Sequence, residues 1–588
     1  MAVPERDRLP ALADASTVLG AAGWLAVVLV GVFGPIRDIV ALAMLVLVPL
    51  ALRLADTPRR DGSRSGWYRA AVVGQPVAAV AGVVSLALPR GPTATLVAAP
   101  WTLVTVLVAG FGAWRLLGRG PWPVEELAVD AGLLYIVVGG AALLFDRSGT
   151  ALVFEPLIVT LTIVHFHYAG SALPVLAGLA GRDAPGGYRG RLLRATTAIV
   201  VVGPGIIGIG ITAAALDLPF AAAVEFAGVA AFTVAVAVFS LSVLVGVVPR
   251  RENGVQRLLL GVASIAVTVS MGFAVLYGLA RATGGTYLGI NAASFDLMVT
   301  YHGQLNAYAF ALPALVGWRL AIPATRSRQP GIAFGRLRGG WRIGSAFLDR
   351  RGVTTDAAVT GMVTTVDEYA HDGFDPDAVA PAVTRFYEHS GAYELSVDPA
   401  WATPWRTLAA PYRPIAVRVG QLSVPRQAID GDAVLRGRVV GVDIGEGQAD
   451  QRAWIRSNAD RVDDARRMTY VGVYDRSVAD DTAFLRVAFP LPGGNLTGIL
   501  RLENGGSDGD GLALSSFPTP GNADDAGLYL VVGGVGLRLP LNERLVVVPD
   551  GDGVRATHRV EALGLTLFTL TYGIRPTDES LEPEPTAE

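Results

Sequence analysis

The chain has 588 residues, of which 52% are apolar, and it contains no cysteine. This length exceeds that of one small domain, and the lack of cysteine excludes disulfides and thiolate metal sites. Residues 1–330 carry 23 arginines and 16 acidic side chains, whereas residues 331–588 carry 25 arginines and 35 acidic side chains. The acidic second half argues against nucleic acid as a partner. The uneven distribution of charge predicts two regions of the chain that are in contact with different solvents.

Apolar stretches of about 20 residues, each long enough to cross a bilayer as a helix, recur through the first 320 residues. They predict a polytopic α-helical membrane domain of about ten spans over residues 1–321. The predicted spans are 14–34, 36–55, 67–89, 94–117, 124–145, 151–180, 193–216, 219–248, 255–281 and 292–320. The sixth is longer than a bilayer requires, so we expect tilt or a break there, with Gly170 and Pro174 as the residues that permit it.

Arginine placement predicts the orientation of these spans, because cytoplasmic loops are enriched in basic residues. The loops that follow even-numbered spans hold most of the arginines, namely Arg53, Arg59, Arg60, Arg64, Arg115, Arg119, Arg182, Arg189, Arg191, Arg250, Arg251, Arg326 and Arg328. The other loops hold about one each, namely Arg37, Arg90, Arg147 and Arg281. We therefore expect a protein of the cytoplasmic membrane, in contact with the lipid bilayer, with both termini in the cytoplasm.

The region after the spans has a different pattern. Residues 322–351 form an Arg- and Gly-rich segment that we expect to be a cytoplasmic linker. Residues 352–575 predict a mostly β cytoplasmic domain that begins with helices near 353–369 and 376–390 and continues as short alternating apolar runs between turn residues. Residues 576–588 are acidic and proline-rich, which predicts a disordered tail.

Ionisable side chains at bilayer depth are costly, so each is a hypothesis about function. Seven stand out within the predicted spans, namely Asp130, Glu155, His165, His167, Glu225, Asp296 and His302. The predicted orientation places the three histidines near mid-membrane and Glu155, Glu225 and Asp296 in the outer half. Tyr168 and Tyr301 flank the histidines and can exchange hydrogen bonds.

Helical geometry separates two of the histidines. Residues two apart on a helix do not share a face, so His165 and His167 should point to nearly opposite sides unless the helix unwinds. His302 and Asn306 are four apart and share a face. Three interpretations remain open: interhelical hydrogen bonds, a proton or solute path lined by the histidines with the three outer carboxylates, or a metal or haem site formed by His165, His167 and His302.

The second half offers weaker signals. Arg385, Tyr387, Glu388 and His389 lie at a predicted helix end, which is more often a mixed-charge face than a pocket rim. Trp454 and Arg456 suggest a stacked pair, and His558 lies alone on a predicted strand, which favours a structural role. No P-loop, dinucleotide motif or Ser-His-Asp constellation is recognisable, so no enzymatic role is favoured.

Four motifs carry a resemblance. "HFHYAG", "LPVLAG" and "YHGQLNAYAFALPALVGWR", with "RFYEHSGAYEL" further on, resemble motifs of the YndJ-like family of bacterial and archaeal membrane proteins. The motifs include His165, His167, Gly170, His302, Gly303 and Asn306, although "NAYAF" replaces a typical glycine near Tyr308. The resemblance implies a multi-pass membrane architecture of uncharacterised function.

These observations together favour transport or permeation of a small solute or ion, with a cytoplasmic domain that senses a ligand. One alternative is a membrane-embedded metal or haem enzyme that uses the three histidines; no cofactor is otherwise implied. Another is a membrane-anchored lipid-binding or sensory protein. The sequence gives neither the substrate nor the oligomeric state.

Overall fold

The computed structural model describes residues 8–59, 62–150, 152–325, 337–403, 405–445, 451–458, 462, 467–479, 482–518, 525–533 and 535–577. The chain folds as two compact units: Met1–Leu116 with Pro121–Gln329, and Leu117–Gly120 with Pro330–Glu588. Arg60, Arg326, Arg328, part of the predicted linker and almost all of the predicted tail lie outside the described residues.

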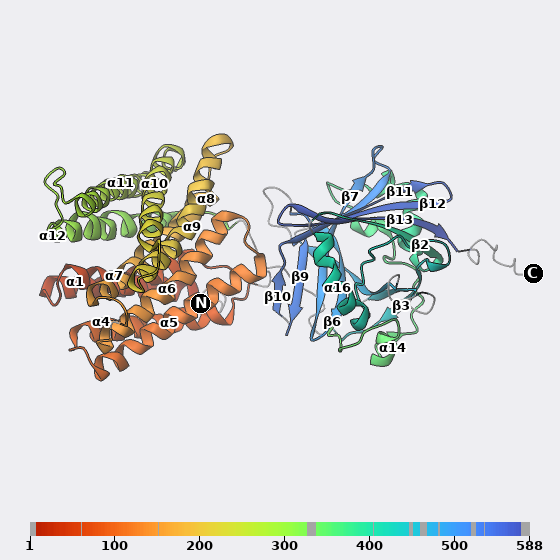
Figure 1. Ribbon diagram of the computed structural model, residues 1–588, viewed down its shortest axis with the longest axis horizontal. Helices are drawn as coiled ribbons and strands as arrows, with labels where there is room; N and C mark the ends of the chain where they lie inside the picture. Colours follow the sequence, from red (N-terminus) through yellow and green to blue (C-terminus); the bar gives the residue numbers. More distant parts are fainter. Residues whose placement is uncertain are drawn as a thin grey trace, which may run out of the picture. The chain divides into compact units, whose positions relative to one another are not determined.

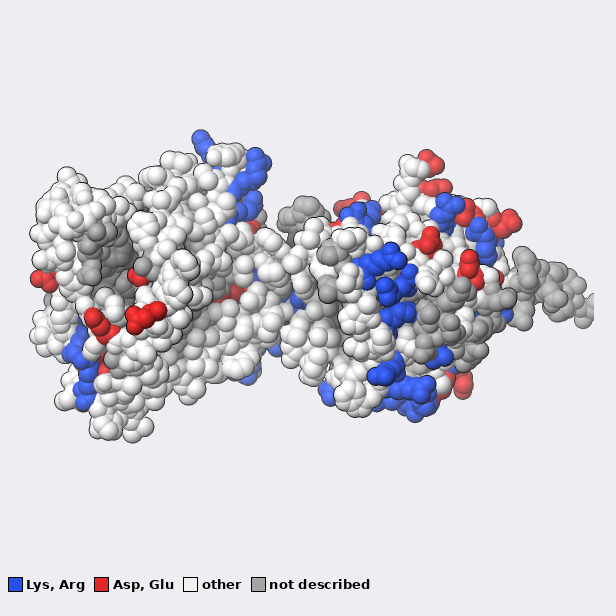
Figure 2. All heavy atoms as spheres, viewed as in Figure 1, with Lys and Arg blue, Asp and Glu red and all other residues white. Residues whose placement is uncertain are grey.

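The first unit is helical (Figure 1). Among the described residues, nine helices are long and apolar enough to cross a membrane: Arg8–Val30, Pro35–Leu54, Gly66–Ala87, Pro92–Arg119, Val124–Ser148, Pro156–Arg182, Gly187–Ala215, Ala223–Arg250 and Gly254–Ala280. They correspond to the first nine predicted spans. Most of the face of this unit in Figure 2 is free of charged side chains, as expected of a surface that contacts lipid.

The tenth predicted span is also helical, as α12 (Phe295–Met298), η5 (Val299–Ala311) and α13 (Leu312–Leu320), but it is not among the nine. Asp296, His302, Gln304 and Asn306 make this segment more polar than the others. The same polar residues that made this segment a candidate functional site therefore make it less apolar than a typical membrane span.

Within the described residues of this unit, three π-helical segments interrupt the helices: η2 (Ala43–Leu47), η3 (Tyr168–Ala172) and η5. Each ends directly before an X-Pro pair that opens the next α-helix, at Pro49, Pro174 and Pro313. Proline lacks an amide hydrogen and its ring clashes with the carbonyl four residues back, so widening the preceding turn relieves that conflict. The long sixth helix thus widens before Pro174 and does not unwind.

A buried ionic network ties helices α5 (Pro92–Arg119), α6 (Val124–Ser148) and α8 (Leu173–Arg182) together. Arg115 lies 2.6 Å from Asp130 and 2.9 Å from Glu126, and Arg182 lies 2.8 Å from Glu126. All four side chains are buried. Asp130, which the sequence singled out only as an ionisable residue within a span, and the predicted loop arginines Arg115 and Arg182 are therefore part of an internal charge network.

The second unit is built on one antiparallel sheet with strand order β1-β3-β4-β5-β6-β7-β8-β11-β12-β13-β2, and β9 and β10 extend from β7. The strands are β1 (Thr354–Thr355), β2 (Tyr393–Trp401), β3 (Arg436–Val442), β4 (Arg452–Ser457), β5 (Thr469–Ala479), β6 (Thr482–Leu491), β7 (Gly494–Gly505), β8 (Gly511–Ser515), β9 (Gly527–Val532), β10 (Val535–Arg538), β11 (Leu541–Asp550), β12 (Gly553–Ala562) and β13 (Leu565–Pro576). The mostly β prediction is thereby confirmed.

The sheet closes on itself. Leu395 and Val397 of β2 exchange backbone hydrogen bonds of 2.7–3.0 Å with Leu435 and Ile429, which precede β3. These bonds join one end of the strand path to the segment that leads into the other end. The strands from β3 to β2 therefore form a ring, and a ring of strands encloses an interior.

The helix predicted near 353–369 is wrong: the segment holds β1 and only one 3-10 turn, η6 (Val366–Tyr369). Its polar Thr, Asp and Gly residues favour turns over a helix. The second predicted helix is shorter than expected, as α15 (Pro381–Glu388). Helix α16 (Trp405–Val419) was not predicted, because Pro411 and Pro414 obscure its pattern.

Candidate functional site

The ring of strands in the second unit surrounds a largely apolar cavity of about 590 Å³. This volume lies within the range of pockets that hold small ligands. The cavity is lined by strands β2, β4–β9 and β11–β13 and by helices α15 and α16. Its lining residues include Leu395, Trp401, Trp405, Ala409, Trp454, Arg456, Tyr470, Tyr474, Phe489, Leu500, Leu514, Glu543, Leu545, Val547, Ala556, His558, Val560, Phe568, Leu570 and Tyr572.

The lining follows from the period of a strand, because alternate residues point to the same face. On β12 the residues Ala556, His558 and Val560 point inward, whereas Thr557 between them is exposed. Helix α16 contributes Trp405, Ala409 and Tyr412, which are spaced to lie on one helical face. The inner, largely apolar face of the sheet, completed by residues of α15 and α16, thus forms the cavity.

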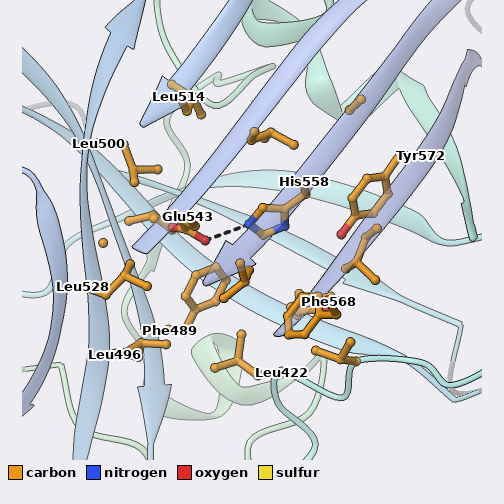
Figure 3. A pocket seen from close by; sticks show the side chains of 18 of the residues that line it. Leu422, Phe489, Leu496, Leu500, Leu514, Leu528, Glu543, His558, Phe568 and Tyr572 are labelled. Atoms are coloured by element: carbon orange, nitrogen blue, oxygen red, sulfur yellow. Dashed lines mark hydrogen bonds and ion pairs between the residues drawn. The ribbon is translucent and has the colours of Figure 1, made fainter. Parts of the chain in front are cut away.

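A carboxylate–imidazole pair lies within this apolar surface. His558 Nε2 lies 2.8 Å from Glu543 Oε2, and both side chains are largely buried (Figure 3). The two residues come from the adjacent strands β11 and β12. Figure 3 shows His558 between Glu543 and Tyr572, with Phe489 and Phe568 nearby. The sequence favoured a structural role for His558, but the structure places it in the cavity wall.

Arg456 adds a positive charge to the wall. Its guanidinium lies 4.1 Å from the centre of the Trp454 ring and 5.1 Å from that of Tyr470. The register places Arg456 directly opposite Tyr470 on β5. The stacking between Trp454 and Arg456 that the sequence suggested is therefore present, and it lies at the cavity.

Three tyrosines bring hydroxyl groups to the same wall. Burial is the main cause that raises the pKa of Tyr470, Tyr474 and Tyr572, with a value of about 12 for Tyr572. Arg456 opposes this rise in all three pKa values. The hydroxyls consequently stay protonated, and able to donate hydrogen bonds, well above neutral pH.

The raised pKa of Tyr572 predicts a loss of stability at alkaline pH. An unfolded tyrosine ionises near pH 10, whereas Tyr572 stays neutral in the fold until about pH 12. Its contribution is fully present below about pH 10 and falls by about 3 kcal/mol as the pH rises to about 12. Chemical unfolding of the β-rich unit across this window should show that fall. Tyr572→Phe should reduce the pH dependence, and an unchanged slope would contradict the assignment.

The helical unit brings together two of the three membrane histidines. The rings of His165 and His302 lie 6.5 Å apart between centroids. His165 Nδ1 lies 2.8 Å from the Leu161 carbonyl oxygen, and His302 Nδ1 lies 3.1 Å from Ser270 Oγ. Asn306 Nδ2 lies 3.5 Å from His302 Nδ1, as their shared face predicts. Within the described residues, the Nε2 atoms of both histidines have no hydrogen-bond partner.

His167 lies apart from this pair. Trp101 Nε1 donates to His167 Nε2 at 3.1 Å, and His167 Nδ1 lies 2.7 Å from the Ile163 carbonyl oxygen. Trp101 can only donate, so Nε2 is the acceptor and Nδ1 carries the proton. Both ring nitrogens are therefore occupied. The described residues contain no group of three or more His, Cys, Asp or Glu side chains arranged to hold a metal ion.

This arrangement predicts a structural effect for His167. Replacing it with alanine leaves the buried Trp101 indole without an acceptor and opens a void, which should lower the free energy of unfolding of the helical unit by about 2–4 kcal/mol. His165→Ala, at an exposed position, should cost less than about 1 kcal/mol. Thermal unfolding of both variants in detergent compares them, and equal destabilisation would refute the distinction.

The remaining predicted membrane residues do not join the histidine pair. Glu155 and Asp296 are exposed near helix starts, and Glu225 is partly buried. Tyr168 donates to the Ile39 carbonyl oxygen at 2.7 Å, and Tyr301 stacks on Phe273 with ring centroids 4.8 Å apart. The fold thus gathers His165, His302 and Asn306, and it leaves the carboxylates at other positions.

Comparison with known proteins agrees with this architecture. A family model described as YndJ-like protein matches residues 38–310. The "Uncharacterized membrane protein YndJ" of Bacillus subtilis (strain 168) is 26% identical over 512 residues, which cover 86% of this chain and 88% of that protein. The similarity is longer than the helical unit, so it extends into the β-rich unit. No solved structure matches the chain.

The apolar helices and the similarity to a membrane protein define a polytopic membrane protein with a β-rich C-terminal region. The chain is similar to YndJ-like proteins over the residues matched, in agreement with the resemblance of its motifs. It therefore contacts the lipid bilayer.

Sequence reasoning predicted a ligand-sensing domain but did not identify the residues that line its cavity. Glu543 and Tyr572 attracted no attention, and the residues that line the wall are scattered over most strands of the ring. A signal was present in the inward positions of β11, β12 and β13, where Glu543 and His558 interrupt otherwise apolar faces.

Proposed function

We propose that this protein is a membrane-anchored binding protein whose β-rich unit holds an apolar, single-chain ligand in the cavity. The observation that carries the proposal is the cavity itself, about 590 Å³ in volume and lined mainly by apolar side chains. At about 30 Å³ for each water-sized group, this volume accommodates roughly 20 such groups. Burial of an apolar chain there is favourable because it removes that chain from water.

A photo-crosslinking experiment tests this proposal. Full-length protein in phosphatidylcholine nanodiscs is exposed to hexadecanol that carries a diazirine in its chain, and labelled peptides are mapped by mass spectrometry. We expect saturable labelling of the cavity-lining strands β7, β11, β12 and β13. Labelling confined to the membrane-spanning helices would refute the proposal.

A second candidate function is passage of protons or a small polar solute through the helical unit. The observation that favours it is the pair His165 and His302, whose Nε2 atoms lack partners among the described residues while His165 remains exposed. Neutral imidazoles with a free nitrogen can relay protons. Proteoliposomes with a pH-sensitive dye inside should acidify faster with the native chain than with His165→Gln or His302→Gln. Equal rates, with His167→Gln as a further comparison, would exclude this path.

We further propose that both termini lie in the cytoplasm and that the protein resides in the cytoplasmic membrane, as the arginine distribution supports. The chain lacks cysteine, so single introduced cysteines report location without background. Leu218→Cys, after the seventh span, should react with a membrane-impermeant maleimide on intact cells. Glu252→Cys, after the eighth span, should react only after permeabilisation. The reverse pattern would invert the proposed orientation.

A further inference from the structure

Arg456 is the arginine of a largely apolar wall, and the described residues around it do not neutralise its charge. Its side chain is partly buried, and its Nε is buried and has no hydrogen-bond partner. Among the described residues, no hydrogen bond or ion pair is made by its guanidinium. Its contacts are the faces of Trp454 and Tyr470. These rings hold the guanidinium in place and leave its N–H donors unused.

The cavity offers Arg456 no carboxylate of its own. Glu543 is the one acidic side chain among the described lining residues, and it lies 2.8 Å from His558. A buried charge without a partner is unfavourable, so proteins ordinarily pair or neutralise it. An arginine kept at a cavity without an anion is therefore suited to an anion that arrives with a ligand.

Neutral donors accompany this cation. The hydroxyls of Tyr470, Tyr474 and Tyr572 belong to buried side chains of the cavity wall, and none has a hydrogen-bond partner among the described residues. Tyr470 lies opposite Arg456, and Tyr474 lies four residues further along β5 on the same face. Phenol hydroxyls complement an oxyanion because they donate without adding charge.

We propose that the cavity ligand is a single-chain amphiphile with an anionic oxygen-bearing head group, either a carboxylate or a phosphate. Arg456 and the tyrosine hydroxyls bind the head group, and the apolar strands hold the chain. This inference rests on the proposed binding function and adds the chemical class of the ligand. It assigns a binding role to Arg456, for which the sequence predicted only stacking with Trp454.

The test compares three diazirine-labelled probes that share one chain: palmitate, hexadecyl phosphate and hexadecanol. Each is titrated against full-length protein in phosphatidylcholine nanodiscs, and labelling of the cavity strands is quantified. We expect at least tenfold tighter binding of palmitate or hexadecyl phosphate than of hexadecanol. The preferred anion distinguishes a fatty-acid source from a phosphate-bearing one, and either preference supports the proposal.

Variants identify the residue responsible. Arg456→Gln should abolish the preference for the anion, so that palmitate and hexadecyl phosphate bind no more tightly than hexadecanol does to the same variant. Saturable labelling of the cavity strands by hexadecanol shows that the variant remains folded. Arg456→Lys should keep part of the preference. Arg544→Gln is the matched control, because Arg544 follows Glu543 on β11 but is exposed and pairs with Glu503. Hexadecanol binding equal to that of both anions in the native chain would overturn this inference alone. Failure of all three probes to label the cavity would overturn the binding function itself.

Discussion

Glu126→Gln should be among the most destabilising single changes in the helical unit. The carboxylate of Glu126 accepts from Arg115 at 2.9 Å and from Arg182 at 2.8 Å, and its side chain is fully buried. The substitution keeps the shape of the side chain but removes the negative charge that both buried arginines contact. Breaking a buried ion pair in this way typically costs about 3–5 kcal/mol.

Thermal unfolding of the full-length protein in detergent measures this loss. Arg90→Gln provides the matched control, because Arg90 also pairs with an acidic side chain of α6, Asp146, but its own side chain is 47% exposed. Asp146 is buried but keeps its ion pair with Arg147 at 2.6 Å, so loss of the half-exposed Arg90 should cost less than about 1 kcal/mol. Equal effects of the two substitutions would mean that the network contributes no more to stability than a surface ion pair.

Ala556→Phe should abolish ligand binding with little change in stability. Ala556 lies on β12 with its side chain in the cavity wall, between Val547 on β11 and Tyr572 on β13. A phenyl ring at this position occupies space that the ligand needs. Overpacking usually costs about 1–3 kcal/mol in a filled core, but an empty cavity can accept the ring at lower cost.

The expected effect is at least a hundredfold weaker binding of the hexadecanol probe, or about 2.7 kcal/mol. Thr557→Phe is the control, because Thr557 is the next residue on the same strand and points to the exposed face. It should bind as the native chain does. Equal binding by both variants would place the ligand outside the cavity.

The sequence predicted the helical unit well because each span carries its own signal. A long apolar stretch is readable without knowledge of its neighbours, and nine of the ten predicted spans correspond to long apolar helices among the described residues. The opposite faces of His165 and His167 followed from helical geometry alone. The approach of His165 to His302 required the packing of separate helices, so the sequence left open which histidine would be closer.

The β-rich unit was predicted less completely than the helical unit, because its closure depends on contacts between distant segments. Strands such as β6, β7 and β13 were recognisable from alternating apolar residues, but their closure through Leu395, Val397, Leu435 and Ile429 depends on isolated bridges between distant segments. The cavity exists only because of that closure. Arg456 and His558 were therefore visible as residues, whereas their shared position at one cavity was not.

The central claim is that the cavity carries a ligand, and identification of what co-purifies with the protein tests it most directly. Full-length native protein, Ala556→Phe and Thr557→Phe are purified in parallel, extracted with organic solvent and analysed by mass spectrometry. The account predicts a single-chain anionic amphiphile near one per chain in the native protein and in Thr557→Phe, and its loss from Ala556→Phe. The same extracted molecules in equal amounts from all three proteins would contradict it.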